Sequence, residues 1–309
     1  MKGQTALFTA AGIGATLLCL LGISWIGPSG AFLNLLTPVP AAYLSARFGL
    51  RSGIVVVAVT SMLLMQLATT YTLVAYLGMF GIGSLLLPLC LRQKLPWDRA
   101  VLYATLGSTL ATVLMVLLTV VVTGTHVPGL IDQAIHAEVD QAMQLYRNSG
   151  LTESQLLEMQ KMTDKLASFI AGSFYGLFVA SVLAVQSVCL LLLQVLKKNR
   201  FQIPGPAFAQ WRLPAGIIWV LIVAGFSMFV PLPFIALTGR NILVVLLPLY
   251  FFQGMAVVNS FLLRKPYPPL VKGLIYLLLL ILNPLPIIVT GVGVFDLWID
   301  FRRPRQKKI

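Results

Sequence analysis

Long apolar segments, separated by short clusters of basic residues, run through almost the whole chain. Each is close to the roughly 20 apolar residues that an α-helix needs to cross the hydrocarbon core of a bilayer. Only 10% of the residues are charged, whereas a soluble domain has about a quarter. Because the bilayer offers no water to unpaired backbone groups, segments of this length are expected to be helical. The sequence therefore predicts an all-α polytopic membrane protein embedded in the lipid bilayer.

We expect about eight to ten transmembrane helices. The candidate segments are residues 5–26, 31–48, 53–70, 73–91, 100–123, 167–196, 213–230, 241–263 and 270–301. The last segment is too long for one straight span, and it contains Asn283, Pro284 and Pro286. We therefore predict that it forms either two short helices that meet at the sequence NPLP or a re-entrant hairpin.

The basic residues favour one topology among those that these segments allow. With a cytoplasmic N-terminus and ten crossings, four of the 22 lysines and arginines fall outside, which leaves 18 on the cytoplasmic side. The four exceptions are Arg147, Lys161, Lys165 and Arg240. This asymmetry follows the positive-inside rule and predicts that both termini are cytoplasmic. It also explains the net charge of +13, so we expect no binding to nucleic acid.

A polar insert at residues 124–166 divides the predicted spans into two sets. Residues 1–123 hold spans 1–5, and residues 167–309 hold spans 6–10 and a basic cytoplasmic tail. The insert contains six of the nine acidic residues, which are Asp132, Glu138, Asp140, Glu153, Glu158 and Asp164. We therefore expect it to lie in water, outside the cytoplasm.

The insert has the pattern of an amphipathic helical hairpin. Ile131, Ala134, Ile135 and Val139 recur at helical spacing, as do Leu156, Met159 and Met162. The sequence NSG at residues 148–150 predicts the end of a first helix. Thr152 followed by Gln155 fits a capping box that begins a second helix, which would lead into the sixth span.

Small residues recur four apart in two of the predicted spans. The sixth span contains Gly172, Gly176, Ala180 and Ala184, and the first contains a weaker version with Ala10 and Gly14 beside Ala11 and Ala15. Such strips let another helix approach closely, so that van der Waals contact drives association in lipid. They indicate either packing within the chain or docking of a membrane-protein partner.

Motifs for enzymatic chemistry are missing from the sequence. It contains no HExxH, P-loop or GxSxG motif, and its only histidines are His126 and His136, both in the polar insert. The three cysteines lie in separate apolar segments and are expected to act as small hydrophobic residues. We therefore expect no catalytic residue, no metal site and no cofactor, and we predict that the protein is not an enzyme.

Asp296 is almost the only acidic or basic residue within a predicted span, and it lies near the end of that span, four residues before Asp300. Acidic residues in spans often mark ion pathways, but a proton relay needs a second buried acid or histidine on another span. Arg302 and Arg303 follow it closely. We expect Asp296 to pair with these arginines near the membrane surface.

Several polar side chains lie toward the outer half of the predicted spans. The candidate ligand-binding residues are Asn34, Gln66, Tyr71, Tyr175, Arg240 and Asn241. A small-molecule pocket needs only a few polar groups in an apolar lining, so these residues are sufficient for an outward-facing site. Hydrogen bonds between helices and interfacial aromatic residues are the alternative explanation.

Pro38 and Pro40 lie close to Asn34 in the second predicted span. Each proline removes a backbone donor and leaves a carbonyl group without its helical partner. Free backbone groups at membrane depth are tolerated only against protein or a wet cavity. The prolines are therefore compatible with a cavity, whereas Arg47 and Arg51 are expected to anchor the cytoplasmic end.

Three stretches carry a family resemblance. They are P-x-P…L-x-A-R-F-G-L-R-x-G at residues 38–53, LYRNSGLTESQL at 145–156 and GVFDLWIDFRRPR at 293–305. With them, the chain resembles the YybS-like family of bacterial membrane proteins of unknown function. That family is distantly similar, over the first six spans, to the substrate-capturing S subunits of energy-coupling factor transporters, and at about the same level to the rod-shape factor MreD.

The resemblance implies two functions and a location in the bacterial cytoplasmic (inner) membrane. Similarity to S subunits implies a transporter-like component that binds a vitamin-sized ligand from outside and has no ATPase of its own. It also implies a helix that docks on a coupling subunit, for which Ala10 and Gly14 are the matching positions. Similarity to the rod-shape factor implies instead a structural or assembly protein of the cell envelope that acts through helix–helix contacts.

Overall fold

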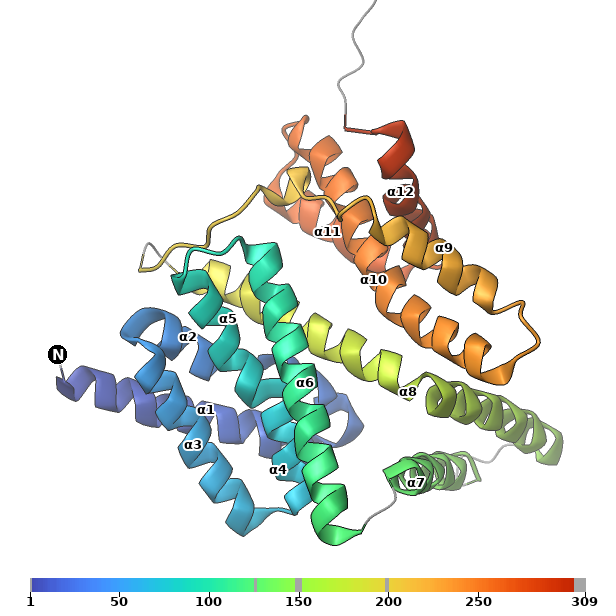
Figure 1. Ribbon diagram of the computed structural model, residues 1–309, viewed down its shortest axis with the longest axis horizontal. Helices are drawn as coiled ribbons and strands as arrows, with labels where there is room; N and C mark the ends of the chain where they lie inside the picture. The colour runs from blue at the N-terminus through green and yellow to red at the C-terminus, as the bar shows by residue number, and fades with distance from the viewer. Residues whose placement is uncertain (1, 125–126, 148–151, 198–199, 303–309) are drawn as a thin grey trace, which may run out of the picture. The chain divides into compact units, whose positions relative to one another are not determined.

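The computed structural model describes residues 2–124, 127–147, 152–197 and 200–302. These residues form helices and no strands, which confirms the all-α class (Figure 1). The chain is divided into two compact units. Unit 1 comprises residues 1–130 and 181–205, and unit 2 comprises residues 131–180 and 206–309.

Unit 1 contains the N-terminal helices and the end of the long helix α8. Its elements are α1 (Lys2–Ile26), the 3₁₀ helix η1 (Gly27–Leu36), α2 (Val39–Phe48), α3 (Leu50–Leu67), α4 (Thr70–Tyr76), the π-helix η2 (Leu77–Gly81), α5 (Ile82–Arg92), α6 (Trp97–Thr123) and the last turns of α8 (Glu153–Leu196). Its apolar core joins α2, α3, α4 and η2 through Leu44, Val56, Leu64, Tyr76 and Phe80.

Unit 2 contains most of helix α7, the first part of α8 and the C-terminal helices. Its elements are α7 (Val127–Arg147), α8 up to residue 180, the 3₁₀ turn η3 (Phe208–Gln210), α9 (Ile217–Ser227), α10 (Pro233–Leu263), α11 (Pro269–Ile281) and α12 (Leu285–Ile299).

Among the described residues, six helices are long and apolar enough to cross a membrane, or seven if α11 and α12 count as one bent span. This number is lower than the eight to ten expected, because two predicted spans consist of shorter elements. Residues 213–230 contain α9, which has only 11 residues. Residues 31–48 change from η1 to α2 at Pro38, and both Pro38 and Pro40 lie at the start of α2. Proline fits the first turn of a helix and not its interior, so the prolines begin a short helix here.

The last apolar segment is divided into two helices, and this break was predicted. Helices α11 and α12 are separated by residues 282–284 and are bent by 98° relative to each other (Figure 1). Pro286 lies in the first turn of α12. The break therefore coincides with the NPLP sequence.

The two helices of the predicted hairpin are present in the structure. Ile131, Ile135 and Val139 lie on the less exposed side of α7, whereas Ala134 is exposed. In α8, Leu156 and Met159 are half-buried and Met162 is exposed. At the start of α8 the backbone N–H of Thr152 donates to Oε1 of Gln155 (3.0 Å), and the backbone N–H of Gln155 donates to Oγ1 of Thr152 (3.5 Å). This reciprocal pair confirms the capping box, whereas the NSG sequence lies outside the described residues.

Helices α10 and α12 approach closely through two glycines. A Cβ atom added at Gly293 would lie 2.8 Å from the backbone nitrogen of Gly254 and would collide with the carbonyl oxygen of Tyr250. A Cβ atom added at Gly254 would collide with the carbonyl group of Val289. Because backbone atoms are the obstacle on both sides, a larger residue fits at neither glycine without separating the helices.

Candidate functional site

Two of the six predicted ligand-binding residues, Arg240 and Asn241, meet α8 at one helix crossing in unit 2. The side-chain amide of Asn241 donates from Nδ2 to the carbonyl oxygen of Gly172 (2.8 Å). Its Oδ1 accepts from the backbone N–H of Gly176 (2.7 Å). These two backbone groups are four residues apart, so an α-helix normally pairs them with each other. The amide therefore joins the hydrogen-bond ladder of α8 and fixes α10 against it.

The small-residue strip of α8 forms part of this crossing. A Cβ atom added at Gly176 would lie 2.5 Å from the carbonyl oxygen and 2.9 Å from Cα of Asn241. A Cβ atom added at Gly172 would collide with Nη2 of Arg240. These two glycines thus pack against another helix of the same chain. Ala180 and Ala184, farther along the strip, are half-buried.

Arg240 carries a charge that no described carboxylate neutralises. Its guanidinium carbon lies 5.6 Å from the ring centroid of Phe169, and it would lie 3.0 Å from a Cβ atom at Gly172. The Nε atom is buried and has no hydrogen-bond partner among the described residues. The ion pairs that the structure describes involve Arg212 and Arg302 and not Arg240.

The other four predicted ligand-binding residues lie outside this crossing or point away from it. Tyr175 is beside Gly176 in sequence, but its side chain is 64% exposed. In unit 1, Asn34 is half-buried in η1, Gln66 is exposed near the end of α3, and Tyr71 is 54% exposed at the start of α4. None of these four lines either of the two cavities with described linings.

The predicted packing residues of α1, unlike Gly172 and Gly176 of α8, are exposed. Ala10 and Gly14 are exposed, and a Cβ atom at Gly14 would have no described atom outside its own helix within 4 Å. The glycine of α1 that does pack is Gly12, where a Cβ atom would lie 2.6 Å from Cδ1 of Leu44. The face with Ala10 and Gly14 is therefore uncovered in unit 1.

A buried polar centre in unit 1 was not predicted from the sequence. Gln186 of α8 has no exposed surface, and neither its amide nitrogen nor its amide oxygen has a hydrogen-bond partner among the described residues. The buried hydroxyl groups of Ser108 and Thr105 on α6 also lack such partners. Gly83 of α5 adjoins both helices, because a Cβ atom there would lie 2.6 Å from Cδ of Gln186 and 2.9 Å from Oγ of Ser108.

The helix that faces this centre is irregular. The π-helix η2 directly precedes α5, and π-helical turns are rare and occur frequently at functional sites. Gly78 in η2 lies against Thr112 of α6, whose hydroxyl donates to the carbonyl oxygen of Ser108 (2.8 Å). Small residues of η2 and α5 thus leave room for polar side chains from neighbouring helices.

A buried ionic cluster closes the C-terminal end of α12. Asp296 has no exposed surface, and its Oδ2 lies 2.9 Å from Nη2 of Arg302 and 3.7 Å from Nε of Arg212. Arg212 also pairs with Asp300. The expected pairing of Asp296 with Arg302 is confirmed, whereas Arg303 lies outside the described residues. The contribution of Arg212 was missed, because it comes from a distant part of the sequence.

Arg302 also holds the segment that precedes α9. Its Nη1 donates to the carbonyl oxygens of Ala209 and Trp211, both at 2.8 Å. Burial lowers the pKa of Arg302, and the adjacent Asp296 carboxylate acts in the opposite direction. Gln253 of α10 adds a neutral contact nearby, since it accepts from the backbone N–H of Leu213 (2.9 Å) and donates to the carbonyl oxygen of Gly293 (3.0 Å). Together these contacts fix the segment that precedes α9 to α10 and to the C-terminal end of α12 within unit 2.

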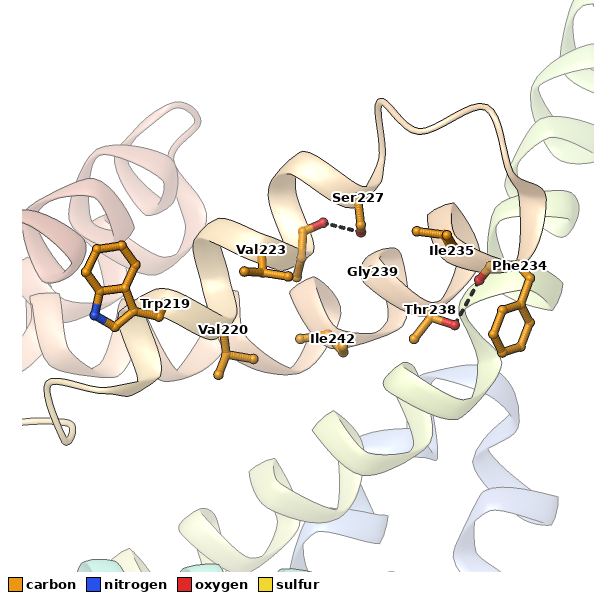
Figure 2. Close-up of a pocket in the computed structure, with 10 residues that line it drawn as sticks. Trp219, Val220, Val223, Ser227, Phe234, Ile235, Thr238, Gly239 and Ile242 are labelled. Carbon is orange, nitrogen blue, oxygen red and sulfur yellow. Dashed lines mark hydrogen bonds between the residues drawn. The ribbon is translucent and has the colours of Figure 1, made fainter.

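A groove of about 460 Å³ lies between α9 and α10 (Figure 2). Trp219, Val223 and Phe234 are among its lining residues. The hydroxyl groups of Ser227 and Thr238 donate to carbonyl oxygens of their own helices at 2.8 Å, so neither donor proton is available to a ligand. The groove is therefore apolar.

A family model described as a predicted membrane protein, DUF2232, matches residues 14–297. The chain belongs to this family. The match includes the buried polar centre, the α8–α10 crossing and Asp296, and the family description agrees with the apolar helices found here. Searches of curated proteins and of solved structures found no match to the chain.

Proposed function

We propose that this DUF2232 protein binds a small molecule within the membrane and serves as a transporter-like component. Such a component resembles the S subunits of energy-coupling factor transporters and depends on an ATPase from another chain. The observation that carries the proposal is the Gln186 amide, which is fully buried without a hydrogen-bond partner among the described residues.

An unpaired amide in an apolar interior is costly. Its transfer from water without a compensating hydrogen bond costs several kcal/mol, and hydrocarbon around the helices supplies no partner. Water or a polar ligand removes this cost by pairing with the amide and with the neighbouring hydroxyl group of Ser108. Because these groups are all uncharged, they favour an uncharged ligand with hydrogen-bond donors and acceptors. We expect the ligand to pass other polar residues of the same unit on its way to this centre, and the candidates are Asn34, Gln66 and Tyr71.

A thermal-shift screen of the purified protein in detergent tests this proposal. A vitamin, nucleobase and lipid-precursor panel is expected to contain a compound that raises the melting temperature by a few degrees, because a ligand that binds only the folded state stabilises it. Gln186→Leu is expected to abolish the shift, and Gln66→Ala to reduce it.

Gln160→Leu is the matched control, since it makes the same substitution at an exposed position of α8. It is expected to keep the full shift. The proposal fails if no compound shifts the melting temperature, or if a hit shifts Gln186→Leu as much as the unmodified protein.

The second candidate function is a structural or assembly role in the cell envelope. It is favoured by the exposed face of α1 with Ala10 and Gly14, which suits a close-packed helix from a membrane-protein partner. In this case, Gly14→Leu is expected to release a partner that co-purifies with the tagged protein. Gly273→Leu, at an equally open position of α11, is expected to retain it. Equal recovery of the partner with both variants would argue against this function.

We also propose that the protein lies in the bacterial cytoplasmic membrane with both termini in the cytoplasm. In the ten-crossing topology predicted from the sequence, which also counts η1 with α2, α9, α11 and α12 as crossings, 18 of the 22 basic residues lie on one side, and this asymmetry supports the orientation. Labelling of single cysteines placed at each terminus, in a cysteine-free background, would reveal an opposite orientation.

A further inference from the structure

At the α8–α10 crossing in unit 2, the guanidinium of Arg240 has no described counter-ion. Arg240 is the eighth residue of α10, which begins at Pro233, so it lies about 10 Å along the helix at 1.5 Å per residue. The helix is apolar enough to span a membrane. Arg240 directly precedes the predicted span at residues 241–263, and a charged group that is buried in protein at this boundary is costly unless it is paired.

The described acidic residues of unit 2 do not supply the missing charge. Asp296 and Asp300 are paired with Arg302 and Arg212. The acidic residue closest to this crossing in sequence, Asp164 of α8, precedes Phe169 and is exposed, and it forms no described ion pair with Arg240. The counter-charge is therefore expected to come from outside the chain.

The surroundings of Arg240 hold the guanidinium in a defined place. Phe169 lies under it at 5.6 Å, a distance at which an aromatic ring attracts a cation. Gly172 provides space for it, because a side chain there would collide with Nη2. Asn241, the next residue, fixes α10 to the backbone of α8 through both atoms of its amide group.

We propose that this crossing binds an anionic oxygen group, a phosphate or a carboxylate, through the guanidinium of Arg240. Arginine presents its N–H groups in a planar fork that pairs with two oxygens of such a group. No described residue accepts a hydrogen bond from the buried Nε of Arg240. The site lies in unit 2 and is separate from the Gln186 centre, so it does not depend on the function proposed above.

The anionic group has two possible sources, which one set of measurements separates. The melting temperature of the full chain is followed in detergent with increasing sodium phosphate or sodium acetate, at ionic strength held constant with sodium chloride. It is then compared in nanodiscs of phosphatidylcholine alone and with added phosphatidylglycerol. A response to phosphate or acetate indicates a soluble anion, and a response to phosphatidylglycerol alone indicates a lipid headgroup.

Arg240→Gln is expected to weaken the response about tenfold or more in half-maximal concentration, because it removes a charge-assisted hydrogen bond. Arg240→Lys keeps the charge without the fork and is expected to weaken the response less. Arg147→Gln removes a charge from an exposed position of the same unit and is expected to change nothing. Gln186→Leu is also expected to retain the anion response, so a failure of either proposal is recognised separately.

The proposal is overturned if neither anions nor phosphatidylglycerol stabilise the protein, or if Arg240→Gln responds like the unmodified protein. Should Arg240→Gln fail to fold, the comparison of Arg240→Lys with Arg147→Gln decides. An unchanged half-maximal concentration in Arg240→Lys would then overturn the proposal.

Discussion

Gly293→Ala is expected to lower the free energy of unfolding by about 2–3 kcal/mol, although it adds only one methyl group. The added Cβ atom would collide with the carbonyl oxygen of Tyr250 and lie 2.8 Å from the backbone nitrogen of Gly254. Backbone atoms cannot rotate away as the end of a side chain can, so α10 and α12 must separate. Their separation would also lengthen the hydrogen bond from Gln253 to the carbonyl oxygen of Gly293. Unfolding in detergent by a denaturing surfactant measures the change.

Gly291→Ala is the matched control on the same helix. A Cβ atom at Gly291 would have no described atom outside its own helix within 4 Å. Alanine is the better helix former by up to about 1 kcal/mol, so this substitution is expected to be neutral or slightly stabilising. The two variants should therefore change stability in opposite directions. A loss of similar size in both would show that the α10–α12 contact is not as close as described.

Asp296→Asn is expected to destabilise the protein by about 3–5 kcal/mol, the range found when one partner of a buried ion pair is removed. The Asp296 side chain is fully buried and that of Arg302 is 9% exposed, so the remaining cation would have little solvent to compensate it. Arg302 would keep its bonds to the carbonyl oxygens of Ala209 and Trp211, but these groups are neutral. The same detergent unfolding experiment gives the magnitude.

Arg212→Gln provides the comparison within the same cluster. The Arg212 side chain is 44% exposed and lies farther from Asp296, at 3.7 Å. Solvent screens such a pair, so its loss is expected to change stability by about 0–1 kcal/mol. If Arg212→Gln were as damaging as Asp296→Asn, the cluster would act as one buried network instead of a buried pair with an exposed neighbour.

The candidate sites were recognised from the sequence only in part. Gly172 and Gly176 were identified as a packing strip, and Arg240 and Asn241 as polar residues, but nothing in the sequence joined the two sets. The structure joins them, because the side chain of Asn241 bonds to the backbone of both glycines. Such a contact depends on the rotation and register of two helices that are far apart in the chain.

Gln186 is visible in the sequence as one of two amides, with Gln194, within the apolar run from residue 177 to 196. It was missed because an isolated glutamine in a span is equally consistent with a helix–helix hydrogen bond. Only its burial without a described partner, between Gly83 and Ser108, distinguishes it. The close packing at Gly254 and Gly293 was missed for a related reason, since each helix contributes one small residue and no repeated pattern.

The sequence alone determined the membrane class, the helical secondary structure, the break at NPLP and the capping box at Thr152. These features follow from local physics, because the bilayer selects apolar segments by length and proline or capping residues act within one turn. The tertiary structure decided which polar groups find partners, leaving Arg240 without a described counter-ion and pairing Asp296 with Arg302. It did so because pairing depends on helix contacts between distant segments, which local composition does not encode.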